Sequence, residues 1–260
     1  MHMQTLNDLR LAVLIDADNI PYVNVKGMLE EIAKYGTPTF KRIYGDWTKP
    51  TVSGWKSVLL ENAITPVQQY SYTRGKNSTD SALIIDAMDI LYSGKVDGFC
   101  IVSSDSDFTR LATRLREAGM KVIGIGERKT PSSFIVASDK FIYLDIINAS
   151  TSVSEPVSEI NKKGKPGTSK RKSEENETQS TNRRVKRIIA ASITDLADEN
   201  GWAFLGDVGN LILKKQPDFD PRNYGFTKLT PLIRSLDFEI DERDSGRDNI
   251  KLIYIRNKKQ

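Results

Sequence analysis

The chain has 260 residues, of which 38% are hydrophobic and 28% are charged, so it can bury a core and stay in solution. No apolar run approaches the roughly 18 residues of a membrane span, and the start of the chain lacks a signal-peptide pattern, so we expect a cytoplasmic protein. One cysteine, Cys100, excludes an internal disulfide and a cysteine-rich zinc site. One histidine, His2, argues against histidine-based catalysis. Catalysis here would use carboxylates, lysine, hydroxyl groups or a hard metal ion.

The first part of the chain alternates between strand-like and helix-like segments. In chain order, the strands are predicted at residues 11–15, 39–44, 64–70, 98–102, 121–125 and 141–144. The helices are predicted at residues 25–35, 55–61, 79–92 and 108–117. This alternation predicts a mostly parallel sheet with helices on both faces, which is an α/β fold. The glycine-rich fingerprints of the common nucleotide-binding loops are absent from the sequence.

The middle of the chain has a different composition. Residues 150–182 are rich in Ser, Thr, Lys, Glu and Pro and contain few large apolar side chains. Such a segment buries too little surface to offset the entropy of ordering, so we expect a disordered linker. Residues 151–187 hold ten basic and five acidic side chains. This positive charge could attract phosphate groups, or it could belong to a solvated spacer.

The last part of the chain has the pattern of a small mixed domain. Helices are predicted from about residue 183 to Gly201, at 204–214 and at 227–236, and two strands at 238–241 and 250–255. Three helices followed by a β-hairpin form a winged helix-turn-helix plan. We therefore expect three regions, with boundaries at 1–149, 150–182 and 183–260.

Aspartate recurs at the carboxyl ends of the predicted strands of the first domain. Asp16 ends the first strand and Asp46 follows the second. Asp80 opens the helix after the third strand, and Asp105 and Asp107 follow the fourth. In an open α/β sheet these positions converge on one edge. Taken singly, each aspartate could only shape a turn, cap a helix or complement a helix dipole.

Taken together, the aspartates favour a metal site. Two carboxylates about 4 Å apart repel by roughly 4 kcal/mol at an effective dielectric constant near 20. A cluster of them is favoured when a divalent cation compensates the charge or a proton is shared. Because the ligands would all be oxygen atoms, Mg²⁺ or Mn²⁺ is favoured, and such a site suits phosphodiester hydrolysis. Arg74 and Lys76 could hold a phosphate or form an ordinary solvated loop.

Several aromatic residues lie near the predicted strand ends. They could stack on nucleobases, although aromatic residues at such positions usually belong to the core. They are Tyr44, Trp47, Tyr70 and Tyr72.

Three ordered motifs carry a family resemblance. They are Leu-Ile-Asp-Ala-Asp-Asn at 14–19, Gly-Lys-Asn-Ser-Thr-Asp at 75–80 and Val-Ser-Ser-Asp-Ser-Asp-Phe at 102–108. Together with Gly-Glu-Arg-Lys-Thr-Pro at 126–131, they resemble the NYN domain of the LabA-like group, which belongs to the PIN-like nucleases. The resemblance covers about residues 8–146.

The resemblance implies an acidic site that binds Mg²⁺ or Mn²⁺ and cuts single-stranded or structured RNA. It implies that the following residues are catalytic and ligate the metal: Asp16, Asp80, Asp105 and Asp107. It also implies that Asn19 supports the first of these, and Asp46 is a further candidate member. Ser104 stands where many relatives have glycine, and its hydroxyl could either donate to a phosphate or narrow the approach of one.

The last domain resembles the LOTUS or OST-HTH domain. The similar segments are Gly-Trp-Ala-Phe-Leu-Gly at 201–206 and the stretch at 217–229. This resemblance implies binding of RNA or of a protein partner, and we favour RNA. Lys228 is the proposed substrate contact there. With it, we expect a local basic patch formed by Lys214, Lys215, Arg222, Lys228 and Arg234.

The leading hypothesis is a metal-dependent endoribonuclease whose winged helix retains RNA. The first alternative is a noncatalytic RNA-binding or regulatory adaptor with the same acidic cluster. The second alternative is a phosphatase or small-nucleotide hydrolase, which the sequence supports less because it offers no cradle for a terminal phosphate.

Overall fold

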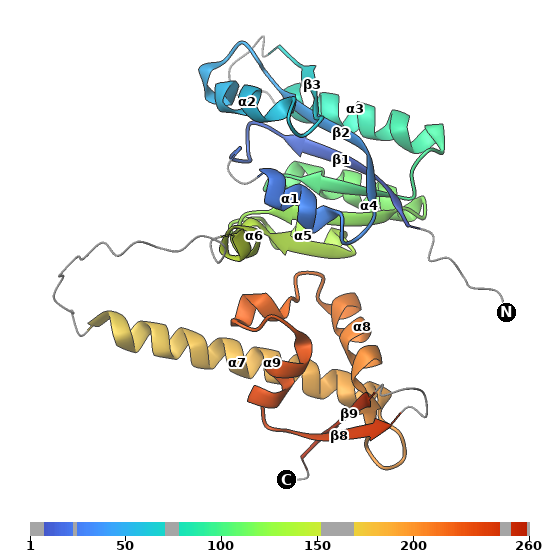
Figure 1. Ribbon diagram of the computed structural model, residues 1–260, viewed down its shortest axis with the longest axis vertical. Helices are drawn as coiled ribbons and strands as arrows, with labels where there is room; N and C mark the ends of the chain where they lie inside the picture. Colours follow the sequence, from blue (N-terminus) through green and yellow to red (C-terminus); the bar gives the residue numbers. More distant parts are fainter. Residues whose placement is uncertain (1–7, 23–24, 71–77, 152–168, 245–250, 259–260) are drawn as a thin grey trace. The chain divides into compact units, whose positions relative to one another are not determined.

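The computed structural model describes residues 8–22, 25–70, 78–151, 169–244 and 251–258, with Ser78, 148–151 and 169–182 described by their backbone. The chain divides into two compact units, Met1–Ser154 and Glu155–Gln260. Figure 1 shows the sheet and helices of the first unit and the smaller set of elements of the second. The division falls inside the segment for which we expect a linker.

Six parallel strands form the sheet of the first unit, in the order β3-β2-β1-β4-β5-β6. The strands are β1 (Arg10–Asp16), β2 (Thr37–Gly45), β3 (Thr65–Gln68), β4 (Gly98–Val102), β5 (Lys121–Gly126) and β6 (Lys140–Tyr143). Each predicted strand is present, and β4 has the predicted bounds. The expected α/β fold is confirmed.

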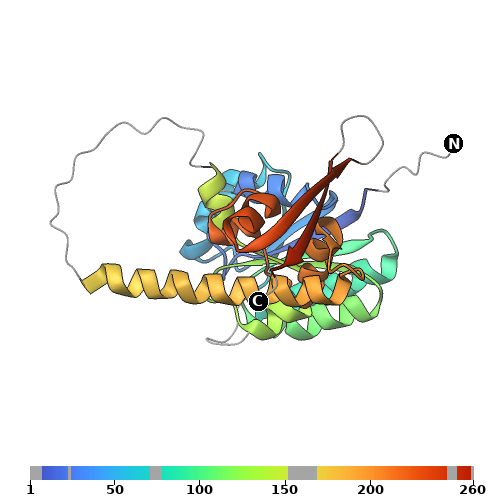
Figure 2. The ribbon, with the colours of Figure 1, turned by 90° about the horizontal axis from the view of Figure 1, so that it is seen from below.

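Helices cover both faces of this sheet, as Figures 1 and 2 show. They are α1 (Val25–Ile32), η1 (Pro50–Trp55), α2 (Lys56–Leu59), α3 (Ser78–Ser93), η2 (Ser106–Phe108), α4 (Thr109–Glu117), α5 (Ser132–Ala137) and α6 (Leu144–Thr151). Successive side chains of a strand point to opposite faces. Accordingly Val13 and Ile15 of β1 pack in the core with α1 and α6, whereas Ala12 and Leu14 pack in the core with α3, α4 and α5.

The strand order creates a crevice at the centre of the sheet. The chain adds β2 and β3 on one side of β1 and then returns through α3 to place β4 on the other side. In open α/β sheets, such a reversal leaves a crevice outside the carboxyl ends of the two strands that flank it. Here those two strands are β1 and β4, and Ile15 pairs with Val102 at their carboxyl ends.

Two helices of the first unit, α5 and α6, were not expected from the sequence. They span six and eight residues, so each is too short to show a clear helical repeat of apolar residues. Phe134 and Ala137 of α5 and Ile146 and Ile147 of α6 are nevertheless buried against the sheet. Tertiary packing therefore stabilises both helices.

The second unit has the expected winged helix plan. Its elements are α7 (Ser169–Leu196), β7 (Ala203–Phe204), α8 (Leu205–Lys215), η4 (Pro221–Tyr224), α9 (Leu229–Ser235), β8 (Phe238–Asp244) and β9 (Lys251–Asn257). Strands β8 and β9 pair antiparallel, and Figure 2 shows this pair beside the helices of the unit. The two-residue strand β7 was not expected, and it completes a sheet of order β7-β9-β8.

Helix α7 begins earlier than the sequence pattern indicates. Its backbone is helical from Ser169, inside the segment 150–182 for which we expect a linker. The C-terminal half of α7 is held by buried Val185, Ile189 and Ile193. Extending an existing helix is easier than nucleating one, and the segment before Val185 is rich in the good helix formers Lys, Arg, Glu and Gln.

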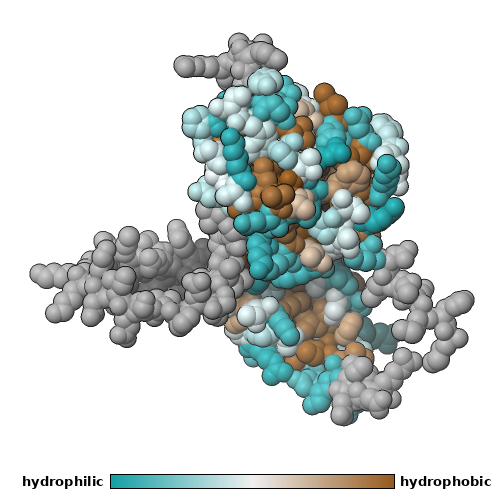
Figure 3. All heavy atoms as spheres, turned by 45° about the horizontal axis from the view of Figure 1, so that its top comes forward, coloured by the Kyte–Doolittle hydropathy of each residue, from teal (hydrophilic) through white to brown (hydrophobic). Residues whose placement is uncertain are grey.

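Polar and apolar side chains mix on the surface. On the face shown in Figure 3, brown hydrophobic groups lie among hydrophilic ones. Two large exposed apolar side chains, Ile85 and Tyr92, lie on α3, and Leu60 follows α2. Among the helices of the described ranges, none has the length and apolar character needed to cross a bilayer.

We predict that Leu14→Ala lowers the free energy of unfolding by about 2–5 kcal/mol, because Leu14 is fully buried in the central strand and its truncation leaves a cavity. Urea unfolding followed by tryptophan fluorescence measures the change. The matched control is Ile85→Ala on the exposed side of α3, where 63% of the residue is accessible and the expected change is within about 0.5 kcal/mol. Equal midpoints for the two variants would contradict the described packing.

Candidate metal centre

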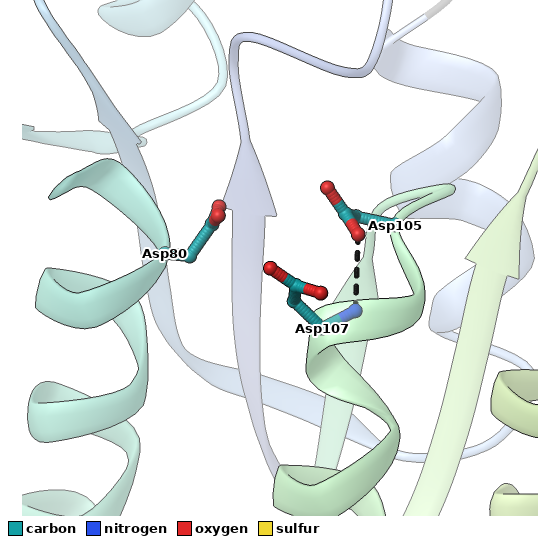
Figure 4. Close-up of side chains that lie close together, drawn as sticks. All are labelled: Asp80, Asp105 and Asp107. Atoms are coloured by element: carbon teal, nitrogen blue, oxygen red, sulfur yellow. Dashed lines mark hydrogen bonds between the residues drawn. The ribbon is translucent and has the colours of Figure 1, made fainter. Parts of the chain in front are cut away.

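Three carboxylates approach one another at the crevice between β1 and β4. One oxygen from each of Asp80, Asp105 and Asp107 lies within 4.8 Å of the others. Figure 4 shows Asp80 extending from the first turn of α3 toward Asp105 and Asp107, which come from the segment after β4. Asp80 is buried, Asp105 is half-buried and Asp107 is exposed, so the cluster is open to solvent on one side.

Local structure fixes the two aspartates after β4. Asp105 has an extended backbone and caps η2, because its Oδ1 accepts a hydrogen bond of 3.0 Å from the backbone N–H of Asp107. This is the N-cap role that short polar side chains commonly play. The cap holds Asp107 in the first turn of η2, where its carboxylate faces the same space as that of Asp105 (Figure 4). The capping role and membership of the cluster are thus compatible.

The fourth predicted carboxylate, Asp16, lies beside this group and has a different set of contacts. It is fully buried at the end of β1, and both of its oxygens accept hydrogen bonds. Oδ1 accepts from the backbone N–H of Asp18 at 3.0 Å, and Oδ2 accepts from Asn19 Nδ2 at 2.7 Å and from Ser103 Oγ at 2.8 Å. Asn19 therefore contacts Asp16 directly, and its part as a supporting residue of the site stays a prediction.

Three further residues that organise the site were not among the predicted site residues. Ser103 donates to Asp16, and its Oγ also accepts a hydrogen bond of 3.1 Å from the backbone N–H of Asp105. Thr79 Oγ1 donates to Asp18 Oδ2 at 3.0 Å, which ties the loop after β1 to the start of α3. The period of two along β4 could have indicated Ser103, because Ile101 and Ser103 point to the same face of the sheet as Leu14 and Asp16.

The cluster perturbs the protonation of its buried members. Burial, followed by repulsion from the carboxylates of Asp16, Asp105, Asp107 and Asp18, raises the pKa of Asp80 to about 6. Burial also raises the pKa of Asp16, although the hydrogen bonds that it accepts oppose this shift. The ionised form of Asp80 is therefore disfavoured when no cation compensates the cluster.

Asp46 and Ser104 lie on the same edge of the sheet but have structural contacts. Oδ1 of Asp46 accepts hydrogen bonds from Thr48 Oγ1 at 2.6 Å and from Gln68 Nε2 at 3.1 Å, which shapes the loop after β2. Ser104 is buried, and its Oγ accepts a hydrogen bond of 2.9 Å from the backbone N–H of Glu127. Among the described residues, the carboxylate of Asp46 is not part of the converging group of Asp80, Asp105 and Asp107.

The aromatic residues considered for base stacking have different environments. Tyr44 is fully buried, and its hydroxyl donates to Asp86, which also pairs with Arg42. Burial raises the pKa of Tyr44. Trp47 Nε1 donates to the backbone oxygen of Val67 at 3.1 Å. Tyr70 is exposed to solvent, whereas Tyr72 lies outside the described residues.

The remaining predicted substrate contacts divide between the two units. Arg74 and Lys76 lie outside the described residues. Lys228 is exposed at the start of α9. Three members of the expected basic patch around it form ion pairs, which are Lys215 with Asp195, Arg222 with Asp220 and Arg234 with Glu242.

The donor set at the crevice fits a hard divalent cation. The three converging carboxylates offer only oxygen atoms, which are the ligands that Mg²⁺ and Mn²⁺ prefer in proteins. Their close approach is electrostatically unfavourable without a compensating cation, as the raised pKa of Asp80 indicates. The converging residues that would hold the cation are Asp80, Asp105 and Asp107. The part of Asp16 as a further ligand stays a prediction, and its hydrogen bond with Ser103 supports the segment that carries Asp105.

The parallel sheet with an acidic cluster at its central crevice defines a PIN-like α/β domain. A comparison with protein-family models gives a finer assignment, because the NYN domain matches residues 10–145 and the OST-HTH/LOTUS domain matches residues 176–250. The chain belongs to the NYN domain family and carries an OST-HTH/LOTUS domain after the NYN domain. Its placement in the LabA-like group stays a prediction.

Solved structures and curated proteins add little to this assignment. A protein of unknown function from Vibrio parahaemolyticus is 21% identical, with a TM-score of 0.45, over 55% of this chain and 97% of its own. An uncharacterized protein from Nitrosomonas europaea is 27% identical, with a TM-score of 0.27, over 41% of this chain and 88% of its own. No curated protein matches the chain significantly.

We predict that Asp80→Asn raises the melting temperature of the protein in EDTA at pH 7. The pKa of Asp80 is about 6 in the folded state and about 3.9 in an unfolded chain, so the folded state loses stability as the pH rises through this window. Asparagine removes that loss, which is about 1–2 kcal/mol at pH 7 after allowance for solvent screening.

Calorimetry from pH 4 to pH 7 measures this effect. The advantage of Asp80→Asn should be mostly lost near pH 4, where the wild-type carboxyl group is protonated in the folded state and about half protonated in the unfolded chain. Asp89→Asn, the same change at an exposed position of α3, is the control and should show no such pH dependence. A constant difference across the pH range would mean that the carboxylates do not repel one another.

Proposed function

We propose that this protein is a metal-dependent endoribonuclease that hydrolyses RNA phosphodiester bonds at the crevice between β1 and β4. The observation that carries the proposal is the convergence of Asp80, Asp105 and Asp107 within 4.8 Å at the switch point of the sheet. Membership of the NYN family, a PIN-like nuclease class, supports the same reaction. A bound Mg²⁺ or Mn²⁺ would supply charge neutralisation at the phosphate and activation of water.

The residues of the chain have distinct parts in this proposal. Asp80, Asp105 and Asp107 hold the cation. Exposed Asp107 lies where the cluster meets solvent, so a phosphodiester can approach from that side. Asp16 acts through its hydrogen bonds, because these join the loop after β1 to Ser103 and so to the backbone of Asp105. Asp16 is thus a positioning residue for the cluster.

The second unit supports RNA as the substrate. OST-HTH/LOTUS domains imply RNA binding, and exposed Lys214 and Lys228 are available on α8 and at the start of α9. Ion pairs engage the other three members of the expected basic patch, so we propose a weaker electrostatic attraction than the five basic residues would give together. Tethering adds to this attraction, because RNA bound by one unit has a raised local concentration at the other.

We predict that Mn²⁺ or Mg²⁺ raises the melting temperature of the wild-type protein. A ligand at about one hundred times its dissociation constant stabilises the folded state by about 2.7 kcal/mol. For a domain of this size that corresponds to a shift of about 5–10 °C. The substitution Asp105→Asn should reduce the shift by more than half, and Asp89→Asn should keep it. An equal shift in all three proteins would place the cation elsewhere.

We predict that the wild-type protein cleaves an internally labelled RNA in Mn²⁺ and that Asp105→Asn cleaves it at least about one hundred times more slowly, because the change removes the charge of a proposed ligand while the amide oxygen can still cap η2. Gel electrophoresis of the products gives the rate and shows whether cuts are internal. Asp89→Asn, purified in the same way, should cleave at the wild-type rate.

Four outcomes of this assay and of parallel binding and phosphatase assays would count against the proposal. Identical cleavage by wild type and Asp105→Asn would indicate a contaminating nuclease. Binding of RNA without cleavage would favour the noncatalytic adaptor, and binding of a protein in place of RNA would favour a partner-binding role for the winged helix. Hydrolysis of p-nitrophenyl phosphate in preference to RNA would favour a phosphatase.

A further inference from the structure

The acidic crevice raises a problem for an RNA substrate. Five aspartates gather at the carboxyl ends of β1 and β4. Asp80, Asp105 and Asp107 converge within 4.8 Å, and hydrogen bonds join Asp16 to Ser103 and Asp18 to Thr79, close to them in the chain. Each nucleotide of RNA brings a further negative charge, and repulsion between like charges falls off slowly in a partly buried site. Cations near this edge of the sheet would offset that repulsion and place the substrate.

The turn after β5 presents two adjacent cations at this edge. Glu127 to Thr130 form a β-turn, in which the backbone N–H of Thr130 donates to the backbone oxygen of Glu127 at 3.0 Å. The hydroxyl of buried Thr130 donates to the same oxygen at 2.7 Å. Arg128 and Lys129 are the two central residues of the turn, and their side chains are 53% and 68% exposed.

Direct contacts fix this turn to the segment that carries the acidic cluster. The backbone N–H of Glu127 donates to Ser104 Oγ at 2.9 Å, one residue before Asp105. Gly126, at the end of β5, lies so close to β4 that a Cβ atom there would be 2.6 Å from the backbone oxygen of Ser103. The turn and the metal-binding segment therefore form one packed structure, and the turn cannot shift without disturbing Ser103 or Ser104.

The cation of Arg128 is held in place before any substrate binds. Its guanidinium lies 4.5 Å from the centroid of the Tyr143 ring, and its Nε donates to Asp145 Oδ2 at 3.1 Å. Lys129 pairs with Glu127 at 2.6 Å. Exposed ion pairs of this kind contribute little net stability, so a phosphate can replace the carboxylate partner at small cost. Arginine is well suited to this exchange because its planar group can bind a phosphate through two donors.

We propose that the Glu127–Thr130 turn is a phosphate-binding arm, in which Arg128 and Lys129 bind a backbone phosphate next to the one at the acidic cluster. Adjacent strands of a sheet lie about 4.8 Å apart, and the Arg128 guanidinium lies over Tyr143 at the end of β6, two strands from β4. Its distance along the edge from the end of β4 is therefore roughly 10 Å, or about one to two nucleotides. The inference rests on the proposed function for its substrate. It assigns to Arg128 and Lys129 the task of positioning the substrate, and none in the reaction itself.

The first test measures binding alone. Fluorescence anisotropy of an unstructured, labelled RNA is recorded with the full chain in EDTA, so that no cleavage occurs, over a series of salt concentrations. The double variant Arg128→Ala/Lys129→Ala should bind about five- to tenfold more weakly. It should also lower the slope of log affinity against log salt by about 0.7, since one lost phosphate contact with a single strand contributes about that much.

A matched control removes the same charges from the opposite end of β5. Arg116 and Lys121 both pair with Asp139 near the amino end of that strand, which is about 17–20 Å from its carboxyl end. The variant Arg116→Ala/Lys121→Ala should retain the wild-type salt slope. If both double variants bind RNA equally weakly, the loss of affinity comes from net charge alone and the proposal is wrong. An unchanged salt slope in Arg128→Ala/Lys129→Ala would also overturn it.

The second test separates positioning from structure. In Mn²⁺, Arg128→Ala/Lys129→Ala should raise KM about five- to tenfold and change kcat less than about threefold. The double variant Arg128→Lys/Lys129→Ala, which keeps one positive charge in the turn, should have a KM between those of the wild type and the double alanine variant. A fall in kcat with KM unchanged would overturn the positioning role. If the wild-type protein does not cleave RNA at all, the proposed function fails, while the binding result in EDTA still decides whether the turn binds phosphate.

Discussion

The arrangement of the site depends on one buried carboxylate. Asp16 lies at the end of the central strand with no exposed surface, where an ionised group must be hydrogen-bonded to be tolerated. Its donors come from the loop after β1 and from Ser103 after β4. Ser103 in turn holds the backbone of Asp105, and Thr79 joins Asp18 to the start of α3. Satisfying this buried charge therefore joins the loop after β1 to the segment that carries Asp105 and Asp107, and the bond between Thr79 and Asp18 adds the start of α3, which carries Asp80.

The sequence indicates where the acidic residues gather better than it indicates which of them converge and which accept hydrogen bonds. Aspartates at the ends of apolar, strand-like runs must meet at one edge of a parallel sheet, so the position of Asp16, Asp80 and Asp105 follows from the order of the elements. Whether a carboxylate faces an open space or a set of donors depends on side-chain directions that a linear pattern does not contain. Asp16 and Asp46 both proved to accept hydrogen bonds from their own loops and neighbours.

Other differences between expectation and structure have the same origin in tertiary context. Helix α5 is six residues long and is stabilised by the burial of Phe134, not by a helical repeat. The basic residues of the second unit are evident in the sequence, but their ion-pair partners are not, and the pair of Lys215 with Asp195 joins positions on two different helices. Helix α7 extends toward its N-terminus because a packed helix can propagate into a segment that would not form one alone.

A crevice rich in carboxylates divides the tasks of binding and catalysis between different parts of the molecule. The feature that suits it to a divalent cation, namely uncompensated negative charge, also repels the polyanion on which it would act. Substrate affinity must therefore come from groups outside the cluster that do not neutralise it. The turn at 127–130 meets this condition, because its cations are paired with Glu127 and Asp145, while the turn is joined to the segment of the cluster through Ser103 and Ser104. The OST-HTH/LOTUS domain on the same chain offers a second source of such groups, since tethering raises the local concentration of any RNA that it holds.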